Sequence, residues 1–161
     1  MLSNQAQVAK IIRNHCKQIG IKCRAKSEGY SMGDSVRVTV YDQPPQVFDA
    51  LNKLWSKYQY GHFDGMQDMY EYSNSRDDIP QTKYLFINNE FSEEIRQAAW
   101  DLIRATYADA QHAPESVKEC NQARIGDEWG DQFLWRFLNG SGGYEVAENF
   151  WRSIKSESKA A

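Results

Sequence analysis

The sequence predicts an α+β fold in which helices cover one antiparallel sheet of about four strands, with a helical C-terminal extension. Segments whose apolar residues recur three and four positions apart, as in helices, alternate with short segments typical of strands. The strands come in neighbouring pairs, whereas a doubly wound nucleotide fold would follow each strand with a crossover helix. At 161 residues, the chain can bury a core without disulfides or metals. The expected order is α-β-β-α-β-β-α.

A helix and a hairpin are expected first. The helix is predicted at 4–18, after Ser3, which is a good N-cap residue. Two strands are predicted at 22–26 and 35–41, and the loop between them, 27–34, is rich in turn-forming residues. Because side chains alternate along a strand, one face of the second strand carries an inward valine stripe of Val36, Val38 and Val40.

The following segment predicts a second helix and another pair of strands. Pro44 and Pro45 suit the first turn of a helix, and one apolar stripe follows them. A third strand with an irregular start is expected from Phe63, and a fourth at 82–88. Ser92 then caps a third helix that faces the core.

The C-terminal part of the chain predicts only helices. Three are expected, at 115–122, 129–138 and 144–154, with a glycine-rich break before the last. We therefore predict two parts, an α+β domain at 8–110 and a helical extension at 111–161 that packs on the same core.

Composition is that of a soluble globular protein, with 25% charged and 41% hydrophobic residues. The N-terminus is polar, and no apolar run approaches the roughly 18 residues that cross a bilayer, so neither an export signal nor a membrane span is expected. The cysteines form no CxxC pattern and are typical of reduced thiols in a cytoplasmic protein. They are Cys16, Cys23 and Cys120.

Charge is distributed unevenly along the chain. Residues 1–60 carry nine Lys or Arg against four Asp or Glu, whereas residues 61–161 carry ten against eighteen. Such an imbalance can turn a cationic face and an anionic face toward different partners, although acidic clusters are most often simply solvated. Five Trp and nine Tyr add side chains that commonly anchor partner surfaces, which favours a binding protein.

Four stretches of the chain carry a family resemblance. They are the basic strand Lys22-Cys23-Arg24-Ala25-Lys26, the turn Tyr30-Ser31-Met32-Gly33-Asp34-Ser35, Phe63-Asp64-Gly65-Met66 with Asp68, and Tyr84-Leu85-Phe86. Over about residues 8–100 the chain resembles the large polyvalent protein-associated domains, small modules of phage and plasmid proteins. The resemblance implies a setting of conflict between mobile DNA and its host, and it implies no known reaction.

No motif for catalysis or metal binding stands out. His62, Asp64, Asp68 and Glu71 lie close in sequence, but they lack a recognised ligand spacing. No segment supplies a nucleophile, a base and a charge stabiliser together. We therefore expect a protein that is not an enzyme and that needs neither a cofactor nor a metal.

The preferred hypothesis is an anti-defence protein acting through an acidic and aromatic surface. The surface would block a host nucleic-acid-targeting complex, such as a CRISPR effector or a restriction enzyme, by competing for its basic DNA site as a DNA mimic. The aromatic tail could also pair two copies into a homodimer. The residues expected to bind the partner are Asp127, Glu128, Trp129, Asp131 and Trp135.

The alternative hypothesis is an accessory protein that binds nucleic acid directly. Lys22, Arg24 and Lys26 share one face of the first strand, and Arg37 and Tyr30 are expected nearby. Cations contact phosphates and aromatic rings stack on bases, so these residues could hold a single strand. The competing interpretation is a solvated outer sheet face, and the overall pI near 5.6 is far from that of a dedicated binder.

Overall fold

The computed structural model describes residues 1–141 and 144–160. The chain divides into two compact units, Met1–Glu90 and Phe91–Ala161, which we call the N-terminal and the C-terminal unit. The α+β class predicted from the sequence is confirmed. None of the helices in the described residues is both long and apolar enough to cross a membrane.

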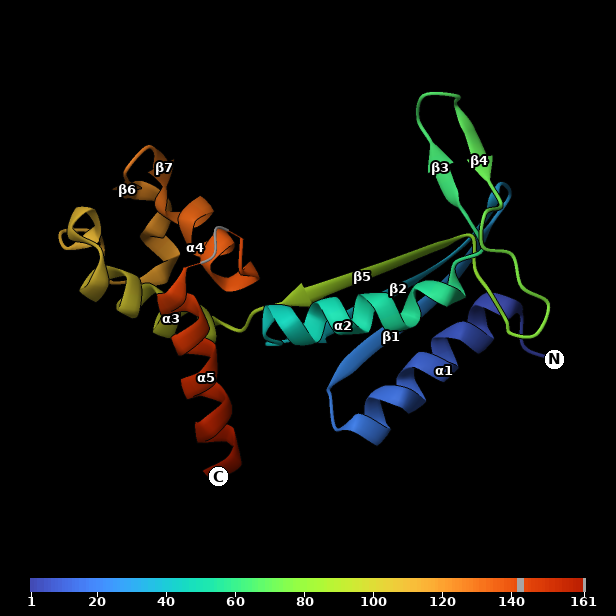
Figure 1. Ribbon diagram of the computed structural model, residues 1–161, viewed down its shortest axis with the longest axis horizontal. Helices are drawn as coiled ribbons and strands as arrows, with labels where there is room; N and C mark the ends of the chain where they lie inside the picture. The colour runs from blue at the N-terminus through green and yellow to red at the C-terminus, as the bar shows by residue number, and fades with distance from the viewer. Residues whose placement is uncertain (142–143, 161) are drawn as a thin grey trace. The chain divides into compact units, whose positions relative to one another are not determined.

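The N-terminal unit begins with α1 (Asn4–Ile19), and the Ser3 hydroxyl caps its first turn as predicted. A hairpin of β1 (Cys23–Tyr30) and β2 (Gly33–Tyr41) follows (Figure 1). Tyr30 pairs with Gly33, so the turn is short and most of the predicted loop at 27–34 is strand. Gly33 adopts a φ of 150°, a geometry that residues with a side chain rarely adopt.

The main sheet has three strands in the order β1-β2-β5, and β5 (Tyr84–Glu90) runs parallel to β2. The predicted sheet of about four antiparallel strands is therefore wrong in two details. First, one of the strand pairs is parallel. In the sequence, α2 (Pro45–Trp55) and the 3₁₀ turn η1 (Ser56–Tyr58) come between β2 and β5 and act as the crossover that parallel pairing requires.

Second, the predicted third strand does not join this sheet. It splits into β3 (His62–Asp64) and β4 (Met69–Glu71), a separate antiparallel hairpin that extends away from the three-stranded sheet (Figure 1). The sequence between these strands contains Asp68, whose φ of 51° is left-handed and fits a tight turn.

The core of the N-terminal unit lies between the sheet and the two helices, which cover the same face of the sheet (Figure 1). The valine stripe points inward as predicted, and all three valines are fully buried. The other buried apolar side chains of this core are Val8, Ala9, Ile12, Cys16, Ala25, Leu51, Trp55 and Tyr58.

The C-terminal unit contains three helices, α3 (Glu93–Thr106), α4 (Gly130–Asn139) and α5 (Glu145–Ala160). Its short elements are the 3₁₀ turns η2 (Ala108–Ala110) and η3 (Val117–Gln122) and the strands β6 (Arg124–Ile125) and β7 (Glu128–Trp129). The helices predicted at 129–138 and 144–154 correspond to α4 and α5, whereas the helix predicted at 115–122 is the 3₁₀ turn η3.

The buried apolar residues form two clusters, one in each unit. In α3, Trp100 and Ile103 are fully buried, and they belong to the same core as Phe137 of α4. The unit boundary therefore falls before α3, one helix earlier than the boundary predicted after residue 110.

Candidate nucleic-acid interface

The two faces of the three-stranded sheet differ in polarity. Both α1 and α2 pack on one face, and side chains that alternate with the buried valines point to the other, which we call the outer face. Strand register places Lys26, Arg37 and Phe86 in one row across β1, β2 and β5. The neighbouring row holds Arg24, Thr39 and Asn88.

Four of the five residues predicted to bind nucleic acid gather at the outer face. Arg24, Lys26 and Arg37 are exposed on it. Lys22 precedes β1, and its ammonium lies 5.0 Å from the centre of the Tyr41 ring. The period-two argument from the sequence therefore placed the cations correctly.

The fifth predicted residue, Tyr30, closes the hairpin at the end of β1. Its side chain is 48% exposed, and its hydroxyl donates a 3.4 Å hydrogen bond to the backbone carbonyl of Asp34. One anion joins the cations on this strand, since Lys26 forms a 3.1 Å ion pair with Glu28. Both side chains of that pair are largely exposed, so water screens it.

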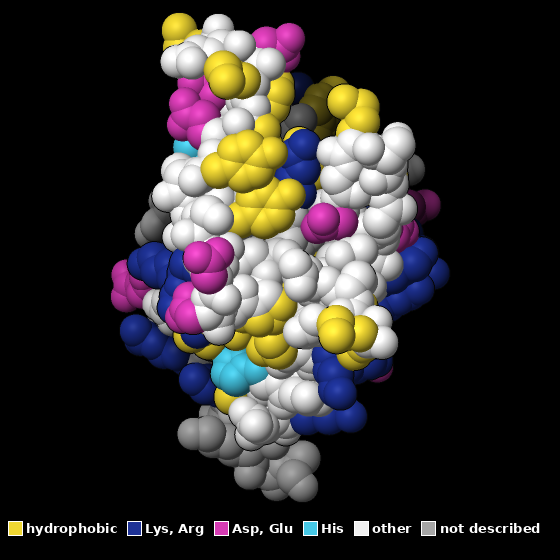
Figure 2. Space-filling view, turned by 90° about the vertical axis from the view of Figure 1, so that its right-hand side faces the viewer, with side chains coloured by type: hydrophobic (Ala, Val, Ile, Leu, Met, Phe, Trp, Pro, Cys, Tyr) yellow, Lys and Arg dark blue, Asp and Glu magenta, His cyan; other side chains and the backbone are white. Residues whose placement is uncertain are grey.

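Five aromatic rings continue the outer face toward the β3–β4 hairpin, and we call them the aromatic ladder. Tyr84 stacks on Phe86 with centroids 6.1 Å apart, and the edge of Tyr70 meets Tyr84 at 5.6 Å. Tyr60 contacts Tyr70 at 5.8 Å and stacks on Tyr72 at 5.5 Å with planes 5° apart. Figure 2 shows hydrophobic side chains, which include tyrosine, grouped beside Lys or Arg in the upper part of the view.

Hydrogen bonds and close packing hold the ladder in place where the hairpin joins the sheet. The Tyr70 hydroxyl donates a 2.6 Å hydrogen bond to the carbonyl of Lys83. The Asp34 carboxylate accepts from the Thr82 hydroxyl at 2.6 Å and from the Lys83 backbone N–H at 2.9 Å. Gly61 packs so closely on this junction that a Cβ there would lie 1.9 Å from the Glu71 carbonyl oxygen.

Cations accompany the ladder at its Phe86 end and at its middle. The Arg37 guanidinium lies 4.8 Å from the centre of the Phe86 ring, and the Lys83 ammonium lies 5.0 Å from Tyr70 and 5.6 Å from Tyr84. Burial is the main factor that raises the pKa of Tyr60 and of Tyr70. These phenols therefore stay neutral at physiological pH and add no negative charge to the surface.

The acidic and aromatic residues of the preferred hypothesis lie around β7 and α4. Trp129 is 45% exposed and Trp135 is 61% exposed, whereas Phe133 between them in sequence is buried. Asp131 is exposed and lies one helical turn before Trp135, on the same side of α4.

This region is less anionic than its sequence suggested, because arginines neutralise part of it. Glu128 forms an ion pair with Arg136. The Arg124 guanidinium lies 4.7 Å from the centre of the Trp129 ring and donates a hydrogen bond to the backbone carbonyl of Asp127. The exposed carboxylates of Asp127 and Asp131 remain next to a mixed surface of tryptophan and arginine.

The residues considered for metal binding are spread over the β3–β4 hairpin. His62 contacts Glu71 at 3.3 Å and Ser73 at 3.0 Å. Asp64 accepts a hydrogen bond from the backbone N–H of Met66 within the turn. Within the described residues, no group of three or more His, Cys, Asp or Glu side chains could hold a metal ion.

The aromatic ladder was not predicted from the sequence. The tyrosines at 60, 70 and 72 surround a Gly-His-Phe-Asp-Gly turn, and their density is the one signal that the sequence offered. Their contact with Tyr84 depends on a hairpin that folds back to the edge of the sheet, which residue spacing does not reveal.

Comparison with known proteins gives one match. The family model of large polyvalent protein associated domain 29 matches residues 3–97, more than half of the chain and nearly the range that the resemblance covered. Searches of curated proteins and of solved structures found no match. The family indicates an association with phages and other mobile elements. The chain belongs to the large polyvalent protein associated domain 29 family.

Proposed function

We propose that this mobile-element protein binds single-stranded nucleic acid through the outer face of its sheet and the aromatic ladder. The observation that carries the proposal is the continuity of Arg37, Phe86, Tyr84 and Tyr70, which joins a cationic strand face to a run of contacting aromatic rings. Bases stack on aromatic side chains whatever their sequence, and Lys or Arg neutralises the phosphates between them.

The protein acts in this proposal by binding alone. The cations at the outer face, including Lys83, outnumber its carboxylates, which are those of Glu28 and Glu90. The net charge of −3 keeps long-range attraction weak, so we expect micromolar affinity and strong dependence on salt. No catalytic step and no cofactor is part of the proposal.

Fluorescence anisotropy with a labelled oligothymidine tests this function. We expect the full chain to bind it at low salt, and we expect Lys22→Ala, Arg24→Ala and Lys26→Ala together to abolish binding. The matched control replaces Lys10, Lys17 and Lys53 by alanine, since these exposed lysines lie on α1 and α2 and give the same change in net charge. Equal loss in both triple variants would reject a specific role for the outer face.

A second candidate is the blocking of a host nucleic-acid-targeting complex, such as a CRISPR effector or a restriction enzyme. The exposure of Trp129 and Trp135 favours it, because tryptophan is enriched among the residues that contribute most to binding at protein interfaces. The partner site would then be formed by Asp127, Glu128, Trp129, Asp131 and Trp135.

Protection of incoming DNA in cells that carry such a defence system tests the second candidate. Asp127→Lys, Asp131→Lys and Trp135→Ala change exposed residues and leave the Glu128–Arg136 ion pair intact. The expected result is loss of protection in this variant with normal folding. If it protects as well as the unchanged protein, the second candidate is rejected.

A further inference from the structure

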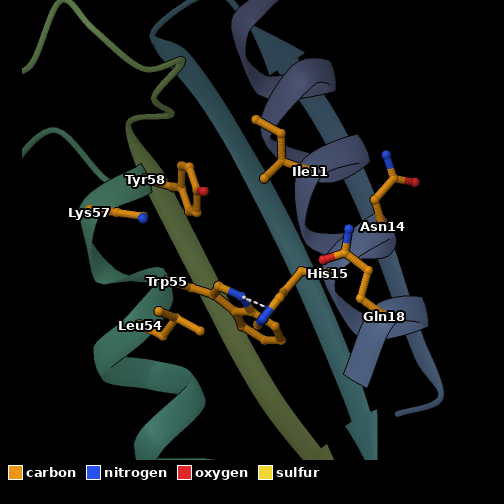
Figure 3. Close-up of a pocket in the computed structure, with 8 residues that line it drawn as sticks. All are labelled: Ile11, Asn14, His15, Gln18, Leu54, Trp55, Lys57 and Tyr58. Carbon is orange, nitrogen blue, oxygen red and sulfur yellow. Dashed lines mark hydrogen bonds between the residues drawn. The ribbon is translucent and has the colours of Figure 1, made fainter. Parts of the chain in front are cut away.

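A pocket of about 300 Å³ lies between α1 and α2, on the side of the N-terminal unit away from the outer face of the sheet. Figure 3 shows His15 of α1 and Trp55 of α2 meeting in the middle, with Leu54, Lys57 and Tyr58 on one side and Ile11 and Gln18 on the other. The pocket is separate from the ladder, and the proposed function does not use it.

One hydrogen bond determines which ring nitrogen of His15 can donate in the pocket. The buried Trp55 indole N–H donates to Nδ1 of His15 at 3.1 Å, and the two rings meet edge to face. An Nδ1 atom that accepts a hydrogen bond carries no proton, so the proton of the neutral imidazole is on Nε2. His15 therefore offers its Nε2–H as a donor. The buried Trp55 side chain sets the orientation of the His15 ring.

The charge of the pocket is positive. Lys57 lines it, with its ammonium 5.4 Å from the centre of the Tyr58 ring. Of the described residues, the eight that line the pocket include no Asp or Glu. An anion entering here would meet an ammonium and an imidazole N–H, and the carboxylate that interacts with Lys57, Asp78, is not among the lining residues.

The remaining walls are apolar. Ile11, Leu54 and Tyr58 supply hydrocarbon and ring surface next to the polar groups, and Leu54 is 46% exposed. Ligand pockets in proteins commonly combine such walls with a few fixed polar groups that orient the ligand.

We propose that this pocket binds a small anion that carries an apolar or aromatic group, with a phosphate monoester or a carboxylate held by Lys57 and His15. The apolar part packs against Ile11, Leu54 and Tyr58. The volume is at the lower end of ordinary ligand sites, which limits the ligand to about the size of a substituted ring.

Phenyl phosphate is the probe for this proposal, and the full chain is observed by ¹H–¹⁵N NMR. The indole N–H signal of Trp55 is the readout, because it reports on the pocket floor and not on the aromatic ladder. We expect phenyl phosphate to shift this signal to saturation. Inorganic phosphate and phenol, which each lack one half of the ligand, are expected to bind at least about tenfold more weakly.

Two variants and one control complete the test. Lys57→Gln removes the charge and should weaken phenyl phosphate about tenfold, the effect of one charge-assisted hydrogen bond. Its backbone carbonyl still accepts from the Gln81 amide, so the local fold is retained. Leu54→Ser should weaken phenyl phosphate but not inorganic phosphate.

The control variant is Lys53→Gln, which removes an exposed lysine of the neighbouring helix α2 that does not line the pocket. It should bind phenyl phosphate as the unchanged protein does. The proposal is overturned if phenyl phosphate leaves the Trp55 signal in place, if Lys57→Gln and Lys53→Gln bind equally, or if inorganic phosphate binds as tightly as phenyl phosphate.

Discussion

The guanidinium of Arg37 lies 4.8 Å from the centre of the Phe86 ring, across neighbouring strands of one sheet. The two residues are register partners on the face that α1 and α2 leave uncovered. This pair joins the cations of the hairpin to the rings of the aromatic ladder. It gives the outer face both of the groups that a single nucleic-acid strand needs.

Removal of one ring of the aromatic ladder should measurably weaken the binding of oligothymidine. Phe86 is 40% exposed, and stacking of a base on such a ring contributes about 1–3 kcal/mol. Phe86→Ala should therefore lower the affinity for oligothymidine about tenfold in an anisotropy titration. Trp135→Ala removes a more exposed ring of the C-terminal unit and should leave the affinity unchanged. Equal effects of both variants would contradict the ladder as the site of stacking.

Neutral replacements of the strand cations should change the salt dependence. Each phosphate contact contributes roughly 0.7 to the slope of log affinity against log salt concentration for a single strand. Arg24→Gln together with Lys26→Gln should reduce that slope by about 1.4, if each cation makes one contact. A titration at several salt concentrations measures it. An unchanged slope would show that these two cations do not meet phosphates.

The hairpin base offers a matched pair of glycine substitutions. A Cβ at Gly61 would lie 1.9 Å from the Glu71 carbonyl oxygen, so Gly61→Ala must displace β4 and the tyrosines next to it. Gly65 in the hairpin turn has open space around it. We expect Gly61→Ala to weaken oligothymidine binding and Gly65→Ala to leave it intact, with both variants folded by circular dichroism. If Gly65→Ala weakened binding and Gly61→Ala left it intact, the placement of the hairpin would be contradicted.

Several features of the fold were predictable because they depend on local pattern. The alternation of Val36, Val38 and Val40 identified the inner face of β2, and therefore also the face that carries Arg37. The parallel pairing of β5 was not predictable, since it depends on where the crossover helix α2 returns the chain. The packing of α3 against α4 was not predictable either, since an apolar helix face does not specify which element it contacts.

Some features of the candidate site were likewise predictable from local pattern, and others were not. Period two along β1 was enough to place Arg24 and Lys26 together, because neighbours two apart share a face. The ladder joins Tyr60, Tyr70 and Tyr84 through tertiary contacts, and spacing carries no information about those. The neutralisation of Glu128 was missed because Arg136 reaches it from the next helix.

The thiol of Cys16 should be unreactive in the native protein. Burial, with a smaller contribution from the neighbouring Cys23, raises the pKa of Cys16 from 9.0 to about 12. Little thiolate forms at pH 8, and the side chain is 1% exposed. Iodoacetamide followed by mass spectrometry should find Cys16 unmodified until urea unfolds the chain. Rapid labelling of Cys16 in the folded protein would contradict its position in the core.

The same shift predicts how stability depends on pH. Because the folded pKa lies above the unfolded one, the unfolded chain loses this proton first as the pH rises. The stabilisation is complete below about pH 9 and is lost progressively toward pH 12. Urea midpoints should therefore fall less steeply above pH 9 in Cys16→Ala than in the unchanged protein. Parallel curves would mean that Cys16 is not buried as its neutral thiol.

Binding of a single strand of nucleic acid by the outer sheet face is tested most directly by an anisotropy titration of labelled oligothymidine at low salt. The unchanged protein should bind with micromolar affinity, and the variant without Lys22, Arg24 and Lys26 should not. The absence of binding by the unchanged protein at any concentration up to about a hundred micromolar, a range that covers ordinary non-specific affinity, would contradict the account.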